Sequence, residues 1–333
     1  MEHRRNALVA VVAPTVGGLV VLVTLLGLIG TAIRDPHPHD VPVGLVGPTP
    51  AVQQFSEGVN TNAPGAFQFT TYGSEADARA ALDSNDIDAV LVIGNDAPRL
   101  IVAGAAGDAV SGLITMVFTG AFAAQGAHLA VEVTHPLSSG DPHGLILFFL
   151  VLAMVVSTFV SQVVLFVRGG TAGLAARLVA TGVWAVVGAG TGVGLAAWIV
   201  GGYDTTSAGA MAGLLALTSL AVGASTSGLT RLLGAPGIGL AGLVIVLLDL
   251  VSSGGPAGSY FLPDAYRALT PWMPVGQLIT ALRSVLYFDG TAATRPVLVM
   301  VGWLVGGLVL MVIAEATRHR TRAGAVKGVA VSA

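Results

Sequence analysis

The chain has 333 residues, of which 54% are hydrophobic and only 10% are charged, and its formal net charge is −3. A soluble domain usually carries about 25% charged residues, so this composition excludes an ordinary soluble protein and indicates an integral membrane protein. The chain has no Cys, which excludes disulfides, thiolate chemistry and Cys-ligated metal sites.

Six apolar runs are long enough, or nearly long enough, to cross a bilayer, which takes roughly 20 residues. The first follows Arg4 and Arg5 and is longer than the apolar segment of a signal peptide, and its exit, TAIRDP, is a poor cleavage site. We therefore interpret it as an uncleaved anchor. The fifth run is short but can extend at either end. The predicted spans are Ala7–Ile33, Gly144–Val167, Leu174–Val200, Ala208–Leu229, Pro236–Val251 and Pro296–Ala314.

Basic residues near the span ends predict the orientation, because Lys and Arg gather in cytoplasmic loops. With the N-terminus in the cytoplasm, nine of the 15 basic residues lie inside and 15 of the 18 acidic residues lie outside. We therefore expect a multi-pass protein of the cell (plasma) membrane with both termini in the cytoplasm, the C-terminal one being a basic tail over 316–333. The nine basic residues are Arg4, Arg5, Arg168, Arg177, Arg231, Arg318, Arg320, Arg322 and Lys327.

The segment Ala109–Ala127 is apolar enough to suggest a seventh span. Inserting it would invert all later spans and move Arg168 and Arg177 outside, and it has no basic flank. We expect an amphipathic or domain-buried helix instead.

Residues 34–143 form the predicted extracytoplasmic domain, which is long enough for a small α+β fold with its own core. Ser74 followed by Asp77 predicts a capped helix start. The run AVLVIG predicts a buried strand. The expected elements are strands at Val41–Gly47, Phe67–Tyr72, Ala89–Ile93, Leu100–Ala103 and Leu129–Thr134, and helices at Ala51–Val59, Ser74–Leu82 and Ala109–Ala127.

The stretch SEADARAALDSNDIDAVLVIG resembles an element of the extracytoplasmic domain of type-2 ABC exporter permeases and of the related phage-infection-protein (YhgE/Pip-like) membrane proteins. In that element a helix precedes an acidic turn and an apolar strand. The resemblance is carried by Ser74, Glu75, Ala78, Arg79, Ala81 and Leu82.

The segment between the fifth and sixth runs predicts a short amphipathic helix at 274–288. Apolar residues recur there at helical spacing, and Pro274 suits a first helical turn. Trp272 and Tyr287 are typical of a membrane–water interface. The helix is too short to span, so we expect a re-entrant or interfacial helix at the outer leaflet. Its expected polar side comprises Gln277, Thr280, Arg283, Ser284 and Tyr287.

The same segment resembles the corresponding region of type-2 ABC permeases, in which a Gly-rich break precedes L-P, a further Pro, and a helix ending in A-L-R and Gly. The resemblance implies that the helix caps the outer end of a translocation path. A brace without a gating role is the alternative. The matching residues are Gly254, Gly255, Leu262, Pro263, Pro274, Ala281, Leu282, Arg283 and Gly290.

Asp249 is the acid that lies well inside an apolar run. A charge at such a depth usually faces a cavity or a partner, so Asp249 either lines a substrate or proton path or lies near the outer end of its span, where it reaches water or Ser252. We expect Glu315, beside Arg318, to form a surface ion pair. The run GAGTGVGL (188–195) contains two overlapping frames of small residues and predicts close helix packing.

The loop between the second and third spans, Arg168–Arg177, is the predicted ATPase-coupling loop, with Arg168, Gly170, Thr171 and Arg177 as candidates. The resemblance implies an acid shortly before the Gly-Thr pair, and this chain has Arg168 there. That departure favours the members of the superfamily without an assigned ATPase.

The chain is not expected to be an enzyme. It lacks a Walker A loop, so ATP would be hydrolysed by a separate chain. His37, His39 and Asp40 lie in a Pro-interrupted segment that favours a solvated linker over a metal site. We expect no cofactor and no metal in this chain, and no nucleic-acid partner.

The predicted fold is thus an all-α membrane bundle of six transmembrane helices, with an α+β domain inserted between helices 1 and 2. The resemblance implies a dimeric (homo- or heterodimeric) exporter permease for an amphipathic or hydrophobic substrate, working in the lipid bilayer with a separate ABC ATPase. The alternative is a non-transporting membrane protein whose extracytoplasmic domain binds a ligand, a phage or a cell-envelope partner.

Overall fold

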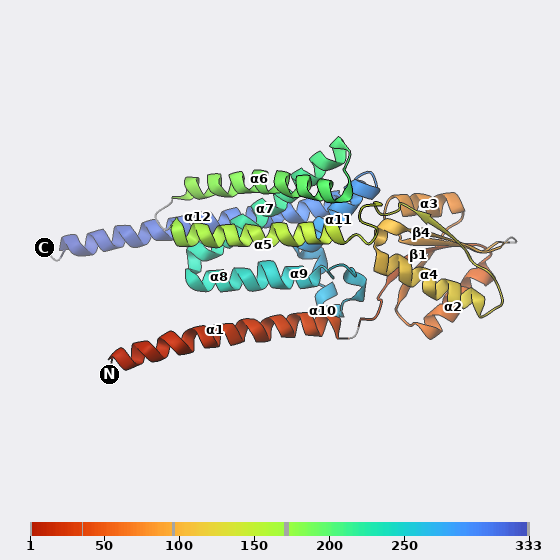
Figure 1. Ribbon diagram of the computed structural model, residues 1–333, viewed down its shortest axis with the longest axis horizontal. Coiled ribbons are helices and arrows are strands. Elements are labelled where there is room, and N and C mark those ends of the chain that lie inside the picture. Colours follow the sequence, from red (N-terminus) through yellow and green to blue (C-terminus); the bar gives the residue numbers. More distant parts are fainter. Residues whose placement is uncertain (1, 35, 95–96, 170–172, 332–333) are drawn as a thin grey trace.

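The computed structural model describes residues 2–34, 36–94, 97–169 and 173–331, with side chains described within 16–317 except at 17, 18 and those gaps. A bundle of long helices carries a sheet domain at one end (Figure 1). The start of helix α1 (Glu2–Ile33) and the end of helix α12 (Thr294–Val331) both lie at the end of the molecule opposite the sheet domain.

The sheet domain is a mixed five-stranded sheet in the order β2-β1-β3-β4-β5. β1 pairs in parallel with β2 and β3, β3 and β4 are antiparallel, and β4 and β5 are parallel. Every strand and helix predicted in this region is present, with ends that differ by a few residues. They are β1 (Val41–Val46), α2 (Thr49–Asn62), β2 (Phe67–Thr71), α3 (Glu75–Asp83), β3 (Ala89–Val92), β4 (Arg99–Ala103), α4 (Asp108–Ala123) and β5 (Ala130–Thr134).

Helices α2 and α4 cover one face of the sheet and α3 covers the other (Figure 1). The predicted cap of α3 is confirmed, because the Ser74 hydroxyl accepts the Asp77 N–H at 3.1 Å. Helix α4 buries Val110, Ile114 and Phe118 at helical spacing in the core of the domain. The prediction that Ala109–Ala127 is a domain-buried helix rather than a span is therefore confirmed.

Five helical segments are long and apolar enough to cross a membrane among the described residues. They coincide with the second to sixth predicted spans, so the chain is a mostly helical, multi-pass membrane protein. The first predicted span lies in α1, of which Leu19–Ile33 is found as a shorter apolar helix. The five are α5 (Leu145–Arg168), α6 (Leu174–Val200), α7 (Thr205–Leu233), the composite segment Ala235–Ser252, and Thr294–Thr317 of α12.

Helix α7 is the central helix of the bundle and packs against α5, α6, α8 and α12. Its second half is buried almost residue by residue from Ala221 to Gly228. A Cβ atom at Gly307 of α12 would lie 2.5 Å from the backbone nitrogen of Ser225, so α7 and α12 touch backbone to backbone there. The outer face of α6 instead exposes apolar side chains such as Trp198, which is 80% exposed.

The predicted close packing at GAGTGVGL holds for one of its two frames. A Cβ atom at Gly188 or Gly192 would touch Met154 or Leu150 of α5, at 3.1 and 3.0 Å. Gly190 and Gly194 have open space beside them. Helix α6 therefore packs on α5 through one frame and presents the other outward.

The fifth span is a composite of α8 (Ala235–Ala241), the π-helical segment η2 (Gly242–Leu248) and α9 (Asp249–Ser252). It ends at Ser252, and the chain then turns at Gly254, which has a φ of +77° and at which a Cβ atom would collide with the carbonyl group of Gly258. Short helices follow: η3 (Ser259–Phe261), α10 (Asp264–Arg267), η4 (Thr270–Trp272) and α11 (Pro274–Tyr287).

Candidate functional site at the junction of the sheet domain and the bundle

Helix α11 fills the junction between the bundle and the sheet domain. It is the predicted amphipathic helix, and Val275, Leu278 and Leu282 are fully buried in the core of the bundle. Trp272, just before it, is 68% exposed, as expected of an interfacial residue. Tyr287 is partly buried and packs against the core of the sheet domain. Part of the polar side of α11 thus meets the sheet domain.

Asp249 holds the beginning of α11. Its side chain is fully buried, and its Oδ1 atom accepts the backbone N–H of Val275 at 3.0 Å. The carboxylate therefore satisfies one of the free N–H groups at a helix N-terminus and complements the positive end of the helix dipole. Its Oδ2 atom has no hydrogen-bond partner among the described residues. Ser252 donates to the Asp249 backbone carbonyl, not to its carboxylate as one sequence-based alternative supposed.

Arg283 ties the other half of α11 to the sheet domain. Its Nη1 atom donates to the carbonyl of Ala106 at 3.0 Å, just before α4. Phe288, at the end of α11, is buried in the core of the sheet domain and stacks on the ring of His135 at 4.8 Å. One helix is therefore bonded to the fifth span at its beginning and to the sheet domain at its end.

Asp88 is a buried acid at the same junction, and sequence reasoning missed it. Burial raises its pKa to about 7, while the neighbouring Tyr260 hydroxyl and the positive charge of Arg283 act in the opposite direction. Burial likewise lowers the pKa of Arg283 and raises that of Tyr260. In the sequence, Asp88 is only the polar residue that precedes a predicted strand. No local pattern could therefore have predicted that it is buried beside Tyr260 and Arg283.

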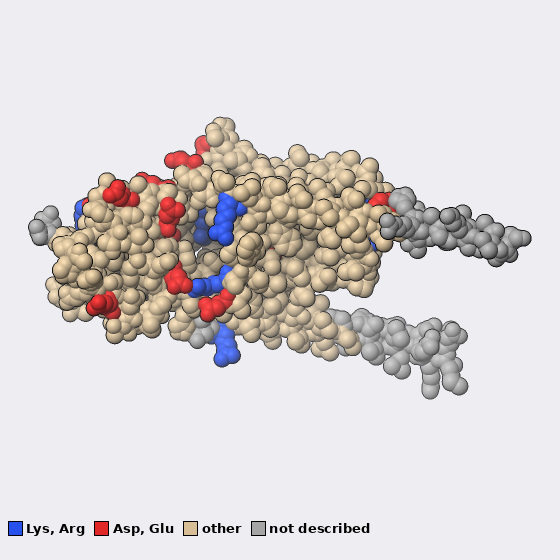
Figure 2. Space-filling model, turned by 180° about the vertical axis from the view of Figure 1, so that it is seen from behind, with Lys and Arg blue, Asp and Glu red and all other residues tan. Residues whose placement is uncertain are grey.

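A polar cleft, the waist cleft, opens between the sheet domain and the bundle. It has a volume of about 330 Å³. Figure 2 shows a hollow at the junction with basic and acidic side chains around it, whereas the visible face of the bundle is nearly free of charge. Arg267 pairs with Asp40 across the cleft at 2.7 Å. The residues that define the waist cleft here are His39, Asp40, Tyr260, Arg267, Gln277 and Arg295.

The remaining predicted residues of the outer segment serve local structure. Pro263 precedes the first residue of α10, and Pro274 lies in the first turn of α11, where a proline removes no helical hydrogen bond. Gln277 is buried and donates to the carbonyl of Thr270 at 3.0 Å. The structure thus brings Asp249, Pro274, Gln277 and Arg283 together on and around α11.

The predicted ATPase-coupling loop lies at the opposite end of the bundle. Arg168 is exposed at the end of α5. Arg177 is buried and donates to the carbonyl of Gly169 at 2.8 Å, so its side chain turns inward. Gly170 and Thr171 lie outside the described residues.

A buried polar seam joins α5, α6 and α7 between these two ends. The Ser227 hydroxyl donates to Gln162 Oε1 at 2.6 Å, and the hydroxyls of Thr158 and Ser219 lie 2.9 Å apart. Hydrogen bonds between membrane helices stabilise their association by about 0.6–2 kcal/mol each. Small polar residues scattered through apolar runs were the only sequence signal for this seam.

Glu315 has a partner on another helix. It is bonded to Arg231 of α7, whose side chain is only 3% exposed, so this ion pair joins α7 to α12 inside the bundle. The side chain of Arg318 lies outside the described residues. Sequence spacing favoured a neighbour on the same helix, whereas the close contact of α7 and α12 supplies a partner from another helix.

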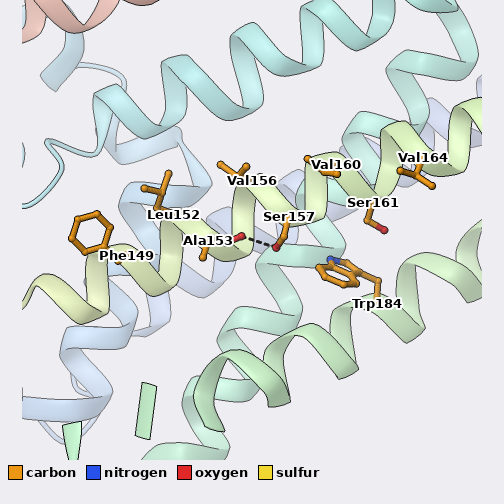
Figure 3. A pocket seen from close by; sticks show the side chains of 9 residues that line it. All are labelled: Phe149, Leu152, Ala153, Val156, Ser157, Val160, Ser161, Val164 and Trp184. Atoms are coloured by element: carbon orange, nitrogen blue, oxygen red, sulfur yellow. Dashed lines mark hydrogen bonds between the residues drawn. The ribbon is translucent and has the colours of Figure 1, made fainter. Parts of the chain in front are cut away.

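A groove with a volume of about 900 Å³ runs along α5 beside α6. Figure 3 shows its lining, which is apolar except for Ser157, Ser161 and the indole nitrogen of Trp184. The Ser157 hydroxyl donates to the carbonyl of Ala153 at 2.6 Å, and the Trp184 nitrogen donates to Thr158 at 3.0 Å. This groove therefore offers a mainly apolar surface without a charged group.

Metal chemistry has no support in the described part of the chain, where no group of three or more His, Asp or Glu side chains could hold an ion. His39 and Asp40 instead contact Tyr260 and Arg267. No protein-family model, curated protein or solved structure matches the chain. The function is therefore argued from the junction alone, where a short helix links a membrane span to a folded domain.

Proposed function

We propose that the chain is a membrane permease subunit of the type-2 ABC kind, which exports an amphipathic or hydrophobic substrate. α1 is its first span and the sheet domain is extracytoplasmic. It functions as a homodimer or heterodimer with a separate ABC ATPase. The observation that carries the proposal is the double attachment of α11, to Asp249 of the fifth span and to Ala106 of the sheet domain. Such a helix changes position whenever the span and the domain move relative to one another.

The mechanism that follows is alternating access between two protomers, with α11 closing the sheet-domain end of the path. The buried junction keeps α11 in register with the fifth span through the hydrogen bond from Val275 to Asp249. The interruption of that span by the π-helical segment η2 supports a moving element, because π-helical turns frequently occur at functional sites.

The decisive experiment is purification from the native membrane, followed by identification of any bound ATPase. We expect an ATPase to co-purify and to support nucleotide-dependent export in reconstituted vesicles. If no ATPase is recovered, and vesicles with candidate ATPases show no nucleotide-dependent transport, the permease proposal is wrong.

A non-transporting role, with the sheet domain binding a ligand or a cell-envelope partner, is favoured by one observation. Arg177 of the predicted coupling loop is turned into the bundle and bonded to Gly169, so this side chain does not present itself to a partner. Absence of an ATPase together with capture of a partner by the sheet domain would establish this second function.

The gating role of α11 has its own test. Arg283→Ala removes the bond to Ala106, and Pro274→Ala loosens the first turn of α11. We expect both variants to reach the membrane in normal amounts and to export more slowly. Arg99→Ala, on the sheet domain away from the junction, is the control. Normal export by both variants would make α11 a static brace.

A further inference from the structure

Three concave surfaces follow one another along α12 and share lining residues, and we call them together the track. The waist cleft shares Arg295 with a groove of about 440 Å³ beside Trp272. That groove in turn shares Gly302 and Trp303 with a third groove of about 560 Å³, which runs between α12 and the fifth span. The track is polar where it meets the sheet domain and apolar along the span.

The polar end carries an excess of positive charge. Arg267 uses its Nη2 atom to bind Asp40, while its Nη1 atom is buried without a hydrogen-bond partner among the described residues. Arg295 is exposed and has no ion pair within the described part of the chain. Two guanidinium groups therefore line the cleft with one carboxylate. An anion with several oxygen acceptors would balance their charge and accept hydrogen bonds from the exposed Arg295.

The apolar end of the track is open because Gly302 and Gly306 have no side chains to fill it. No atom lies within 4 Å of the positions where Cβ atoms of Gly302 and Gly306 would be. The indole nitrogen of Trp303 donates to the carbonyl of Trp272 at 2.7 Å, which fixes the ring beside the groove. The helical rise from Arg295 to Gly306 is about 16 Å. One leaflet of the hydrocarbon core is about 15 Å thick, half of the whole.

We propose that this track binds an anionic phospholipid, with its phosphate between Arg267 and Arg295 and one acyl chain in the groove along α12. The site requires only that the spans lie in a bilayer, so it is independent of whether the chain transports anything. The apolar groove along α5 differs from this track, because it offers a surface for acyl chains but no charged group that could bind a phosphate.

The test measures lipid retention by the full chain, taken from vesicles of phosphatidylglycerol and phosphatidylcholine with identical acyl chains, by native mass spectrometry. We expect phosphatidylglycerol to be retained preferentially. Arg295→Gln and Arg267→Gln should each weaken that preference by about fivefold, the usual contribution of one basic side chain near a lipid surface. Arg295→Lys should keep most of it, and Arg99→Gln should leave it unchanged.

The proposed binding of an acyl chain is tested by filling the groove along α12 with larger side chains. Gly306→Leu and Gly302→Leu place a side chain in open space, so both variants should fold and retain less phosphatidylglycerol. Gly190→Leu, which fills open space on the outer face of α6, is the matched control. Equal retention of the two lipids, unchanged retention by both groove variants, or complete displacement of the lipid by inorganic phosphate would each overturn the proposal.

Discussion

Carboxylates begin three helices at the sheet-domain end of the bundle. Asp141 accepts backbone N–H groups of Leu145 and Ile146 at the start of α5, and Asp204 accepts those of Thr206 and Ser207 at the start of α7. Asp249 does the same for α11, but from another helix and in full burial. An acid within an apolar run is thus explained by the helix that it holds rather than by contact with water.

Removing this carboxylate leaves the Val275 N–H buried without an acceptor. We expect Asp249→Ala to destabilise the protein by about 1–3 kcal/mol, the usual cost of an unsatisfied buried donor. Asp249→Asn keeps an oxygen acceptor at the same place, so its stability should be close to that of the wild type. The measurement is thermal unfolding of the purified protein in detergent, and equal melting temperatures for the wild type and Asp249→Ala would contradict the capping role.

Asp88 makes the stability of the junction depend on pH. Burial raises its pKa in the folded protein to about 7, from 3.8 for an unperturbed aspartate. Between these two values the folded state binds more protons than the unfolded state, so stability falls as pH rises through this window and levels off above about 7. For one titrating group, the free energy of unfolding changes by at most about 1.4 kcal/mol per pH unit.

Asp88→Asn removes this titration. We therefore expect the melting temperature of the variant to fall less between pH 5 and pH 8 than that of the wild type. Asp86→Asn, in the turn before β3, serves as the control and should follow the wild type. Parallel profiles for wild type and Asp88→Asn would show that Asp88 does not titrate in this range.

Among the elements, those with a repeating pattern could be predicted and those set by long-range contacts could not. The strand at β3 and the buried helix α4 follow from apolar runs and helical spacing in the sequence. The same spacing predicted the apolar face of α11. It could not tell that the polar face meets the sheet domain, because the contact from Arg283 to Ala106 joins residues far apart in the chain.

The interruption of the fifth span illustrates the same limit. Its sequence is a uniform apolar run, which is compatible with a regular α-helix, yet seven residues form the π-helical segment η2. Residues of α1, which is remote in sequence, lie beside η2 and α9. A periodic pattern of apolar residues along the chain cannot predict such packing between distant segments.

The contact between α7 and α12 predicts opposite effects for two adjacent glycines. A Cβ atom at Gly307 would press on the backbone of Ala224 and Ser225, whereas one at Gly306 would meet nothing within 4 Å. We expect Gly307→Ala to lower the melting temperature. Gly306→Ala should leave it unchanged or raise it slightly, since Ala favours a helix over Gly by about 0.5–1 kcal/mol. A larger loss at Gly306 than at Gly307 would contradict this arrangement.

At the scale of the whole molecule, the proposed topology places the sheet domain and the loop after α5 on opposite sides of the membrane. The chain has no Cys, so single cysteines can be introduced without background. Asn60→Cys, exposed on α2, should react with a membrane-impermeant maleimide in intact cells. Ala176→Cys, exposed at the start of α6, should react only after permeabilisation. The reverse pattern would invert the topology.

The shortness of the fifth span has a consequence for the surrounding lipid. Its 18 residues rise only about 27 Å, slightly less than the roughly 30 Å of a typical hydrocarbon core. Beyond Ser253 the chain turns at Gly254, and Asp249 accepts the Val275 N–H at the start of α11. On this side the protein matches a thinner bilayer than along α6, whose 27 residues rise about 40 Å. Tilting of the longer helix or a local change in bilayer thickness compensates for such a difference, so we expect the annular lipid beside the fifth span to have shorter acyl chains than the lipid beside α6.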